Sequence, residues 1–127
     1  VAHPVGALRV IVTHLGLGRR ERGHQVRELL ERVVPGGTPL LALMGDANEW
    51  RPALLRPALG RIDRELGPAP RPVTFPARRP LLALDRIWPG PAARLETLRA
   101  HRSAAARVAS DHLPVVADLR VVAGGTP

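Results

Sequence analysis

The sequence predicts an α+β protein with a mixed β-sheet and helices on one face of that sheet. Apolar segments of strand length occur at residues 7–14, 39–46 and 81–88. A helical segment separates the first two, and a strand, a helix and a strand in this order usually connect two parallel strands. A fourth segment, residues 113–122, alternates apolar and polar side chains as a half-buried strand does. If it runs antiparallel to the first two strands, the sheet is mixed.

The first three elements each have a clear pattern. In residues 7–14, alternate apolar side chains lie on one face of the expected strand. Residues 19–34 have a single apolar stripe at the helical spacing i, i+3, i+4 and i+7. The stripe consists of Val26, Leu29, Leu30 and Val33. Pro35 and the two glycines after it end this helix, and residues 39–46 are apolar throughout, as expected of a strand covered on both faces.

The second half of the chain has weaker patterns. Residues 51–72 are rich in Pro and Arg, and their apolar residues predict short helical turns that break near Pro57. In residues 92–102, Leu95 and Leu98 fit a helix. The last segment places one set of side chains on the same face: Val115, Ala117, Leu119 and Val121. No repeat and no linker divides the chain, so we expect a single domain.

The composition excludes several classes of protein. Apolar residues make up 45% of the 127 residues, which is enough for a packed core, and no cysteine is present. Disulfide scaffolds, zinc ribbons and thiol nucleophiles are therefore excluded. No apolar segment is long enough to span a membrane. No signal peptide is visible in these residues, and we favour a cytoplasmic location.

The charge of the chain has two interpretations. The formal net charge is +8, and every basic residue other than histidine is arginine. A GC-rich bacterial genome favours Arg codons, which would explain the bias without any function. Arginine also binds phosphate through a planar fork, which favours a phosphate-containing partner, including nucleic acid. Composition alone does not choose between a nucleic acid, a lipid and a sugar phosphate.

Polar side chains stand at the ends of the expected strands. His14 follows the first strand, Asp46 ends the second, and Asp85 lies within the third. Ser110-Asp111-His112 directly precedes the last strand. Parallel strands end at the same edge of a sheet, and an antiparallel strand begins there. We therefore expect these side chains to converge at one edge.

These side chains suit chemistry on phosphate. The three carboxylates are hard oxygen donors, which prefer Mg²⁺ or Mn²⁺ to zinc. Asn48, two residues after Asp46, could help to position a water molecule. The two histidines could donate hydrogen bonds to a phosphoryl oxygen. A carboxylate beside such a histidine would fix its tautomer and raise its pKa.

Each residue also has a purely structural interpretation. Asp46 follows a glycine, as turn residues often do, and Asn48 is common in turns and helix caps. Asp85 could form a simple ion pair with Arg86, and the segment 110–112 could cap a helix. The remaining histidines have no such context and are expected on the surface: His3, His24 and His101. A functional site is favoured because polar residues occur at or near the ends of all four expected strands.

Four motifs resemble those of the endonuclease/exonuclease/phosphatase superfamily, and they occur in the family order. They are THL (13–15), GDAN (45–48), LDRI (84–87) and SDHLPV (110–115). The segment TFPARRP (74–80) is similar to a bacterial branch of the same family. The resemblance implies a four-layer α/β/β/α sandwich. It also implies that this chain is the C-terminal half of such a domain. The N-terminal half, which carries an Asn and the main metal-binding Glu, would be absent.

The resemblance implies a metal-dependent phosphoesterase. Such an enzyme hydrolyses a phosphodiester, of nucleic-acid or phospholipid type, by in-line attack of an activated water with Mg²⁺ or Mn²⁺ as cofactor. The implied catalytic residues are His14, Asp46, Asn48, Asp85 and His112, with Asp111 and Asp46 as metal ligands and Arg78 and Arg79 at the substrate phosphate. The alternative is a non-catalytic fragment that binds phosphate or nucleic acid and lacks the N-terminal metal ligand.

The resemblance also assigns a role to each position. Asp46 would orient or deprotonate the attacking water, His112 would stabilise the charge at phosphorus, and Asp85 would hold His112. Asn48 would hold the water or a phosphate oxygen. Ala47 departs from the family, because this branch often has an aromatic residue there. In an extended strand it would point away from its two neighbours, so we expect its effect to be on packing.

The apolar pattern predicts a partner for one face of the sheet. The helix at residues 19–34 can cover only one face of the strand at 39–46, and the stripe at residues 115–121 has no evident partner. An uncovered apolar sheet binds a partner or aggregates. We expect the N-terminal half of the same domain, or a second copy, to cover it. The chain alone is therefore expected to self-associate and to be inactive.

Overall fold

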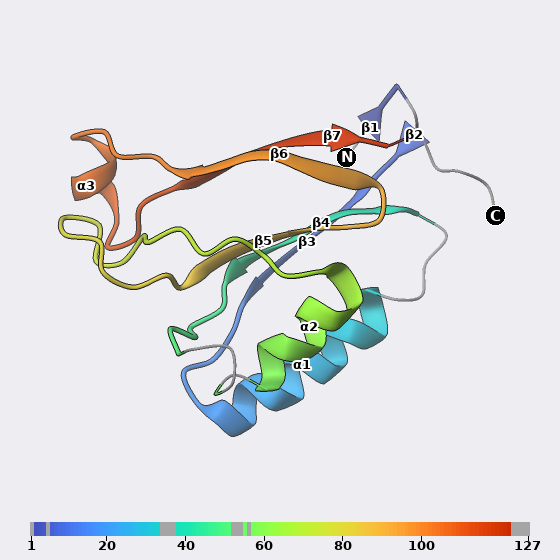
Figure 1. Ribbon diagram of the computed structural model, residues 1–127, viewed down its shortest axis with the longest axis horizontal. Helices are drawn as coiled ribbons and strands as arrows, with labels where there is room; N and C mark the ends of the chain where they lie inside the picture. Colours follow the sequence, from blue (N-terminus) through green and yellow to red (C-terminus); the bar gives the residue numbers. More distant parts are fainter. Residues whose placement is uncertain (1, 5, 34–37, 52–54, 56, 123–127) are drawn as a thin grey trace.

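The computed structural model describes residues 2–4, 6–33, 38–51, 55 and 57–122 (Figure 1). In chain order the elements are β1 (Ala2–His3), β2 (Gly6–Ala7), β3 (Arg9–His14), α1 (Arg19–Val33), β4 (Leu40–Asp46), α2 (Pro57–Leu66), β5 (Asp85–Pro89), β6 (Ala93–Ala100), α3 (Ala106–Ala109) and β7 (Val115–Val121). The chain is therefore an α+β protein, as the sequence predicts.

The central sheet has the strand order β3-β4-β5. Strand β4 pairs in parallel with β3 and antiparallel with β5, so the sheet is mixed. The antiparallel strand is β5 rather than the last strand, which the sequence predicts in this place, because β7 pairs with β6 in a separate two-stranded sheet. The register places Asp46 opposite His14 on one side and opposite Asp85 on the other. Asp85 is the first residue of β5, and this strand runs away from the edge at which β4 ends. The pairing alone thus brings three polar residues to one edge.

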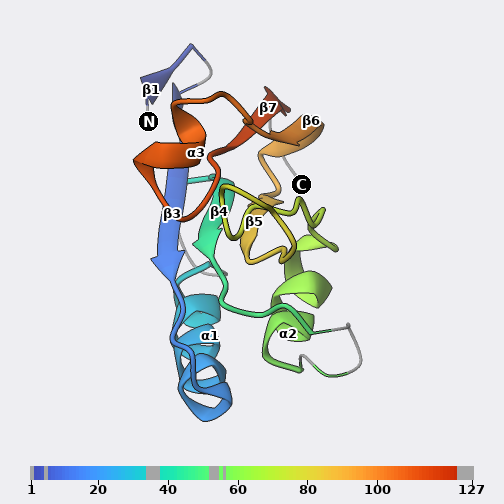
Figure 2. The same cartoon turned by 90° about the vertical axis from the view of Figure 1, so that its left-hand side faces the viewer.

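The two longer helices lie on the same face of this sheet (Figures 1 and 2). The apolar stripe of α1 is buried as predicted, because Val26 and Val33 lie in the main core and Leu29 and Leu30 pack against it. Buried residues that complete this core are Leu15, Leu40, Leu43, Ala47, Leu59, Ile62 and Trp88. None of the described helices is long and apolar enough to cross a membrane.

Helix α2 begins at Pro57, so the break that the sequence predicts near this proline is the start of a helix, and the residues after it form one ten-residue helix rather than short turns. Proline is favoured in the first turn of a helix, where its missing N–H would have no partner within the helix. Leu59 and Ile62 then lie on the buried face of an uninterrupted helix. Leu54, which the prediction also used, lies outside the described residues.

The helix predicted at residues 92–102 is wrong, because Ala93–Ala100 form strand β6, paired antiparallel with β7. The register shifts between Leu95 and Thr97, where the strand has an irregularity. Leu95 and Leu98 are both half-buried, whereas the two residues between them are exposed. The extra residue therefore creates a spacing of three that imitates a helix.

The second face of the sheet is less covered than the helix face. The β6–β7 ribbon lies on that side (Figures 1 and 2). A groove of about 400 Å³ separates Val12, Met44 and Ile87 from Leu113 and Val115, and Val12 is 74% exposed. The described residues thus form a helix layer, a sheet and a ribbon. The four-layer sandwich implied by the family resemblance stays a prediction.

Gly45 allows β3 and β4 to approach closely just before Asp46. Its φ angle is +147°, and a side chain there would overlap the backbone carbonyl of Thr13. Both the conformation and the space therefore require glycine at this position.

We predict that Gly45→Ala lowers the free energy of unfolding by about 3 kcal/mol, because the added methyl group forces β3 and β4 apart. Chemical denaturation measures this change. Gly60→Ala is the matched control, since Gly60 lies in α2 with open space around it. That substitution should be neutral or stabilising by up to about 1 kcal/mol. Equal effects of the two substitutions would contradict the packing argument.

Candidate functional site

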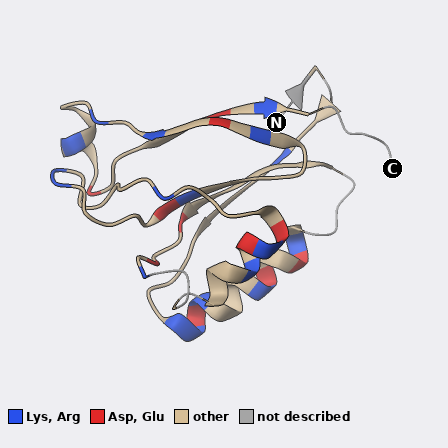
Figure 3. Ribbon diagram, viewed as in Figure 1, with Lys and Arg blue, Asp and Glu red and all other residues tan. Residues whose placement is uncertain are grey.

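A cavity of about 700 Å³ opens at the edge where β3 and β4 end and β5 begins. Its lining includes every site residue predicted from the strand ends: His14, Asp46, Asn48, Asp85, Asp111 and His112. Figure 3 shows the acidic segments at the end of β4 and the start of β5 next to each other. The structure therefore brings together side chains that are up to 98 positions apart in the chain, from 14 to 112.

His112 and Asp85 form the central contact of the cavity. The Nδ1 atom of His112 lies 2.9 Å from Oδ2 of Asp85. An ionised carboxylate can only accept, so Nδ1 donates this hydrogen bond. The other ring nitrogen, Nε2, then faces Asp46, whose Oδ2 is 3.7 Å away. The hydroxyl of Thr74 donates to the same Asp85 oxygen, which holds the carboxylate from its other side.

Asp46 is held in place by the chain that follows it. Its Oδ1 accepts a hydrogen bond from the backbone N–H of Asn48 at 2.8 Å, and its Oδ2 lies 3.5 Å from Nε2 of His14. Asn48 has a φ angle of +48°, and its side-chain N–H donates to the carbonyl of Leu15 at 2.7 Å. The turn after β4 is thereby tied to the turn after β3.

The residues just before β7, from Asp111 to Leu113, are held by Thr74 and its neighbours. The N–H of Leu113 donates to the carbonyl of Thr74 at 2.9 Å, and the N–H of Ala77 donates to the carbonyl of Asp111 at 2.7 Å. The ring of Phe75 lies 5.0 Å from the ring of His112, centroid to centroid. These contacts hold the segment that carries His112 against the loop that contains Thr74. The Asp111 side chain remains exposed at the cavity.

The environment raises the pKa of His112 above its ordinary value of 6.5. Partial burial alone lowers this pKa, because it disfavours the charged ring. The hydrogen bond and negative charge of Asp85, together with the charges of Asp46 and Asp111, outweigh burial. The site therefore favours a protonated imidazole next to two acceptor carboxylates.

Arg78 and Arg79 do not line the cavity. They lie in the exposed turn between Phe75 and Leu82, whose backbones pair with each other. The carbonyl of Arg78 accepts a hydrogen bond from Arg107, which ties this turn to α3. Their contact with the substrate phosphate stays a prediction.

The cavity is also lined or contacted by residues that the predicted site does not include. Arg22 and Glu49 line it as a buried ion pair, Trp50 and Arg51 line its rim, and Thr74 holds Asp85 from below the surface. The segment from Glu49 to Arg51 directly follows the GDAN motif, and this adjacency could have predicted that these residues lie at the cavity. Nothing in the local sequence around Arg22 or Thr74 predicts their partners.

Ala47 is buried in the main core, whereas its neighbours Asp46 and Asn48 line the cavity. Its backbone N–H donates to the carbonyl of Leu84 at 2.9 Å. The small side chain therefore affects packing behind the site, as its position between Asp46 and Asn48 predicts.

Comparison with known proteins gives a fold but no characterised function. The chain is 36% identical over 124 residues to the uncharacterized protein YbhP of Escherichia coli strain K12, and equally to that of Shigella flexneri. The match covers 91% of this chain and 47% of each relative, so the chain spans about half the length of the curated relatives it matches. No protein-family model matches the chain.

Two solved structures have a similar fold. One is a conserved protein of unknown function from Enterococcus faecalis V583, with a TM-score of 0.70, 19% identity, and coverage of 89% of this chain and 50% of that one. The other is an endonuclease/exonuclease/phosphatase from Bacteroides vulgatus, with a TM-score of 0.63 and 18% identity. The match covers 83% of this chain and 46% of that one. The chain thus shares its fold with about half of each of these two structures.

We predict that NMR titration of the His112 ring gives a pKa above 6.5 and that Asp85→Asn lowers it, because burial then acts without the opposing charge. A raised folded-state pKa stabilises the fold below 6.5, and this contribution is lost as pH rises through the raised pKa. The pH-dependent part of the stability difference between wild type and variant should therefore vanish at higher pH.

Asp118→Asn is the control for this titration. Asp118 contacts Thr97 and Arg99 on the exposed β6–β7 ribbon and lies away from His112. It should leave the His112 titration unchanged. If Asp85→Asn also leaves it unchanged, the Asp85–His112 hydrogen bond does not control the charge of the ring.

Proposed function

We propose that this chain carries the catalytic residues of a metal-dependent phosphoesterase that hydrolyses a phosphodiester by in-line attack of an activated water. The observation that carries this proposal is the row Asp85–His112–Asp46 at the cavity, with contacts of 2.9 and 3.7 Å. Such a row supplies an oriented imidazole next to a carboxylate, which is what attack on phosphorus needs for positioning and charge stabilisation. The fold similarity to an endonuclease/exonuclease/phosphatase supports it.

The donor set at the cavity fits Mg²⁺ as cofactor. Asp111 and Asp46 provide carboxylate oxygens, and Mg²⁺ is commonly held by one or two carboxylates together with waters and substrate phosphates. Within the described ranges, no group of three His, Asp or Glu side chains is arranged to hold a metal ion unaided. The two aspartates would therefore be part of a larger ligand set. A bound Mg²⁺ would neutralise negative charge on the phosphate.

The side chains of this chain then have distinct tasks. Asp46 accepts the proton of the attacking water, which the carboxamide oxygen of Asn48 helps to orient. Protonated His112 donates from Nε2 to a phosphoryl oxygen, and Asp85 keeps the ring in that orientation. His14 is exposed at the cavity, 3.5 Å from Asp46, where it can contact the phosphate and protonate the leaving oxygen.

The volume and rim of the cavity indicate a substrate larger than a phosphate group. A cavity of about 700 Å³ is in the range that holds a ligand of drug size. Its rim carries Leu17, which is 81% exposed, and Trp50, which is 56% exposed. The guanidinium of Arg51 lies 5.9 Å from the centre of the Trp50 ring. This rim suits an unstacked nucleic-acid base, or the apolar part of a phospholipid.

The activity test uses the full-length gene product with Mg²⁺ and bis-p-nitrophenyl phosphate, plasmid DNA and phospholipid vesicles as substrates. We predict that Asp85→Asn lowers the rate on the order of 10²-fold or more, because the orientation of His112 is lost. EDTA should abolish hydrolysis. Asp118→Asn should retain it.

A near-normal rate for Asp85→Asn would reduce Asp85 to a structural role. The alternative function, a non-catalytic phosphate- or nucleic-acid-binding fragment, is favoured by the net charge of +8. It predicts binding of phosphate-containing ligands without hydrolysis of any of the three substrates.

Trp50 can distinguish the two substrate types. We predict that Trp50→Leu raises KM for a single-stranded oligonucleotide about tenfold, because base–aromatic stacking contributes roughly 1–3 kcal/mol. Trp50→Phe, the matched control, should keep most of the affinity since it keeps a ring. A phospholipid substrate would instead tolerate leucine, which stays apolar. Equal oligonucleotide kinetics for the two variants would exclude stacking.

A further inference from the structure

We propose that the buried ion pair of Arg22 and Glu49 is a positioning device that holds the turn after β3 and the turn after β4 in one geometry. Nη2 of Arg22 lies 2.8 Å from Oε2 of Glu49, and the two side chains are 4% and 5% exposed. Both residues line the cavity, yet neither takes part in the proposed chemistry. Only the kinetic part of this inference rests on the proposed function.

Arg22 binds the turn that follows His14. Its Nη1 donates to the carbonyls of Gly16 at 3.0 Å and Leu17 at 2.7 Å. Gln25, one turn further along α1, accepts from the N–H of Gly16 at 2.8 Å. Two side chains of α1 thus hold the backbone directly after β3. Gln25 binds its N–H group, and Arg22 binds its carbonyl groups.

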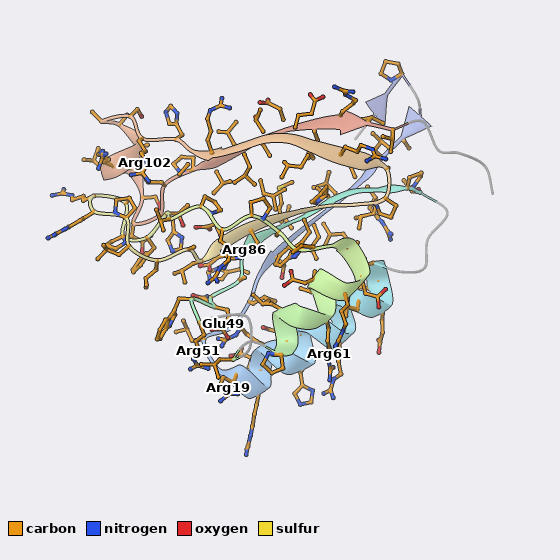
Figure 4. All side chains as sticks on the ribbon, in the orientation of Figure 1. Arg19, Glu49, Arg51, Arg61, Arg86 and Arg102 are labelled. Atoms are coloured by element: carbon orange, nitrogen blue, oxygen red, sulfur yellow. The ribbon has the colours of Figure 1, made fainter. Side chains whose placement is uncertain are left out.

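Glu49 binds the turn that follows Asp46. Its Oε1 accepts from the N–H of Arg51 at 3.1 Å, and its backbone carbonyl accepts from Arg86 of β5 at 3.3 Å. Figure 4 shows Glu49 between the Arg86 side of the sheet and the first turn of α1, where Arg19 lies. One carboxylate therefore joins its own turn to α1, while its backbone is tied to β5.

The two turns carry residues of the candidate site. His14 ends β3 immediately before the turn that Arg22 holds, and Asn48 immediately precedes Glu49. Asn48 also donates to the carbonyl of Leu15. The ion pair and this hydrogen bond together link the two turns, so the position of His14 relative to Asp46 and Asn48 depends on both.

A role in stability alone does not explain a charged pair at this position. Removing two charges from water is costly, and well-packed apolar residues of similar volume often replace a buried pair without loss of stability. Arginine supplies something that apolar residues lack. Its fork reaches a carboxylate and two carbonyls at once, which fixes direction as well as distance.

The double substitution Arg22→Met with Glu49→Leu tests this, because it removes both charges and keeps the apolar volume. We expect it to unfold at close to the wild-type denaturant concentration. The NMR signals of the His14 ring and the Asn48 side-chain amide should shift. In the active protein kcat should fall about 10- to 100-fold with little change in KM, since small misplacements of reacting groups cost that much. The single variant Arg22→Lys keeps the charge and loses the fork. Its kcat should therefore lie between that of the double variant and that of the wild type.

Arg99→Gln is the matched control, because it breaks an ion pair of 3.5 Å that is exposed on the β6–β7 ribbon. It should change neither the NMR signals nor kcat. If the double variant is stable and keeps both wild-type signals and kcat, the pair has no positioning role. If the wild-type protein hydrolyses none of the substrates, the proposed function fails, while the NMR signals of the double variant still decide the positioning role.

Discussion

The pairing of β4 with a strand on each side is the constraint on which the site depends. Because β4 is parallel to β3 and antiparallel to β5, its last residue meets the end of one strand and the beginning of the other. Asp46 therefore lies between His14 and Asp85 without any contribution from a loop. Gly45 makes this arrangement possible, since only a residue without a side chain fits against the backbone of Thr13.

Around this edge, the polar groups are organised by hydrogen bonds rather than by charge alone. Asp85 receives a hydroxyl from Thr74 and an imidazole N–H from His112, so both of its partners come from segments outside the sheet. The loop that contains Thr74 in turn holds the backbone of Asp111 and Leu113. The sheet thus sets where the carboxylates lie, and the loops set how the imidazole is oriented.

Much of the fold was predictable because the local pattern and the final environment agree. The helix of Arg19–Val33 buries its predicted apolar stripe, and the strand ending at Asp46 is buried or half-buried throughout. In the strand ending at His14, by contrast, Ile11 packs against the main core, whereas Val12, one of the alternate apolar residues that the pattern placed on one face, is 74% exposed. Strand β6 was not predictable from its pattern. Its irregular register gives Leu95 and Leu98 a helical spacing, and only pairing with β7 makes it a strand.

The sequence by itself indicated which side chains form the candidate site, because His14, Asp46 and Asp85 stand at the ends of apolar strands that meet at one sheet edge. His112 precedes a strand of the separate β6–β7 sheet and reaches Asp85 from a loop. The sequence did not determine how these side chains are held. Arg22 and Glu49 are 27 positions apart, as are Asp85 and His112, and Thr74 lies 11 positions from Asp85. A hydrogen bond requires the right direction and a donor–acceptor distance that is correct to within a few tenths of an ångström. No spacing in a sequence encodes either of these. Only the packing of α1 and of the loops against the sheet decided which ring nitrogen of His112 faces Asp46 and which arginine is buried beside Glu49.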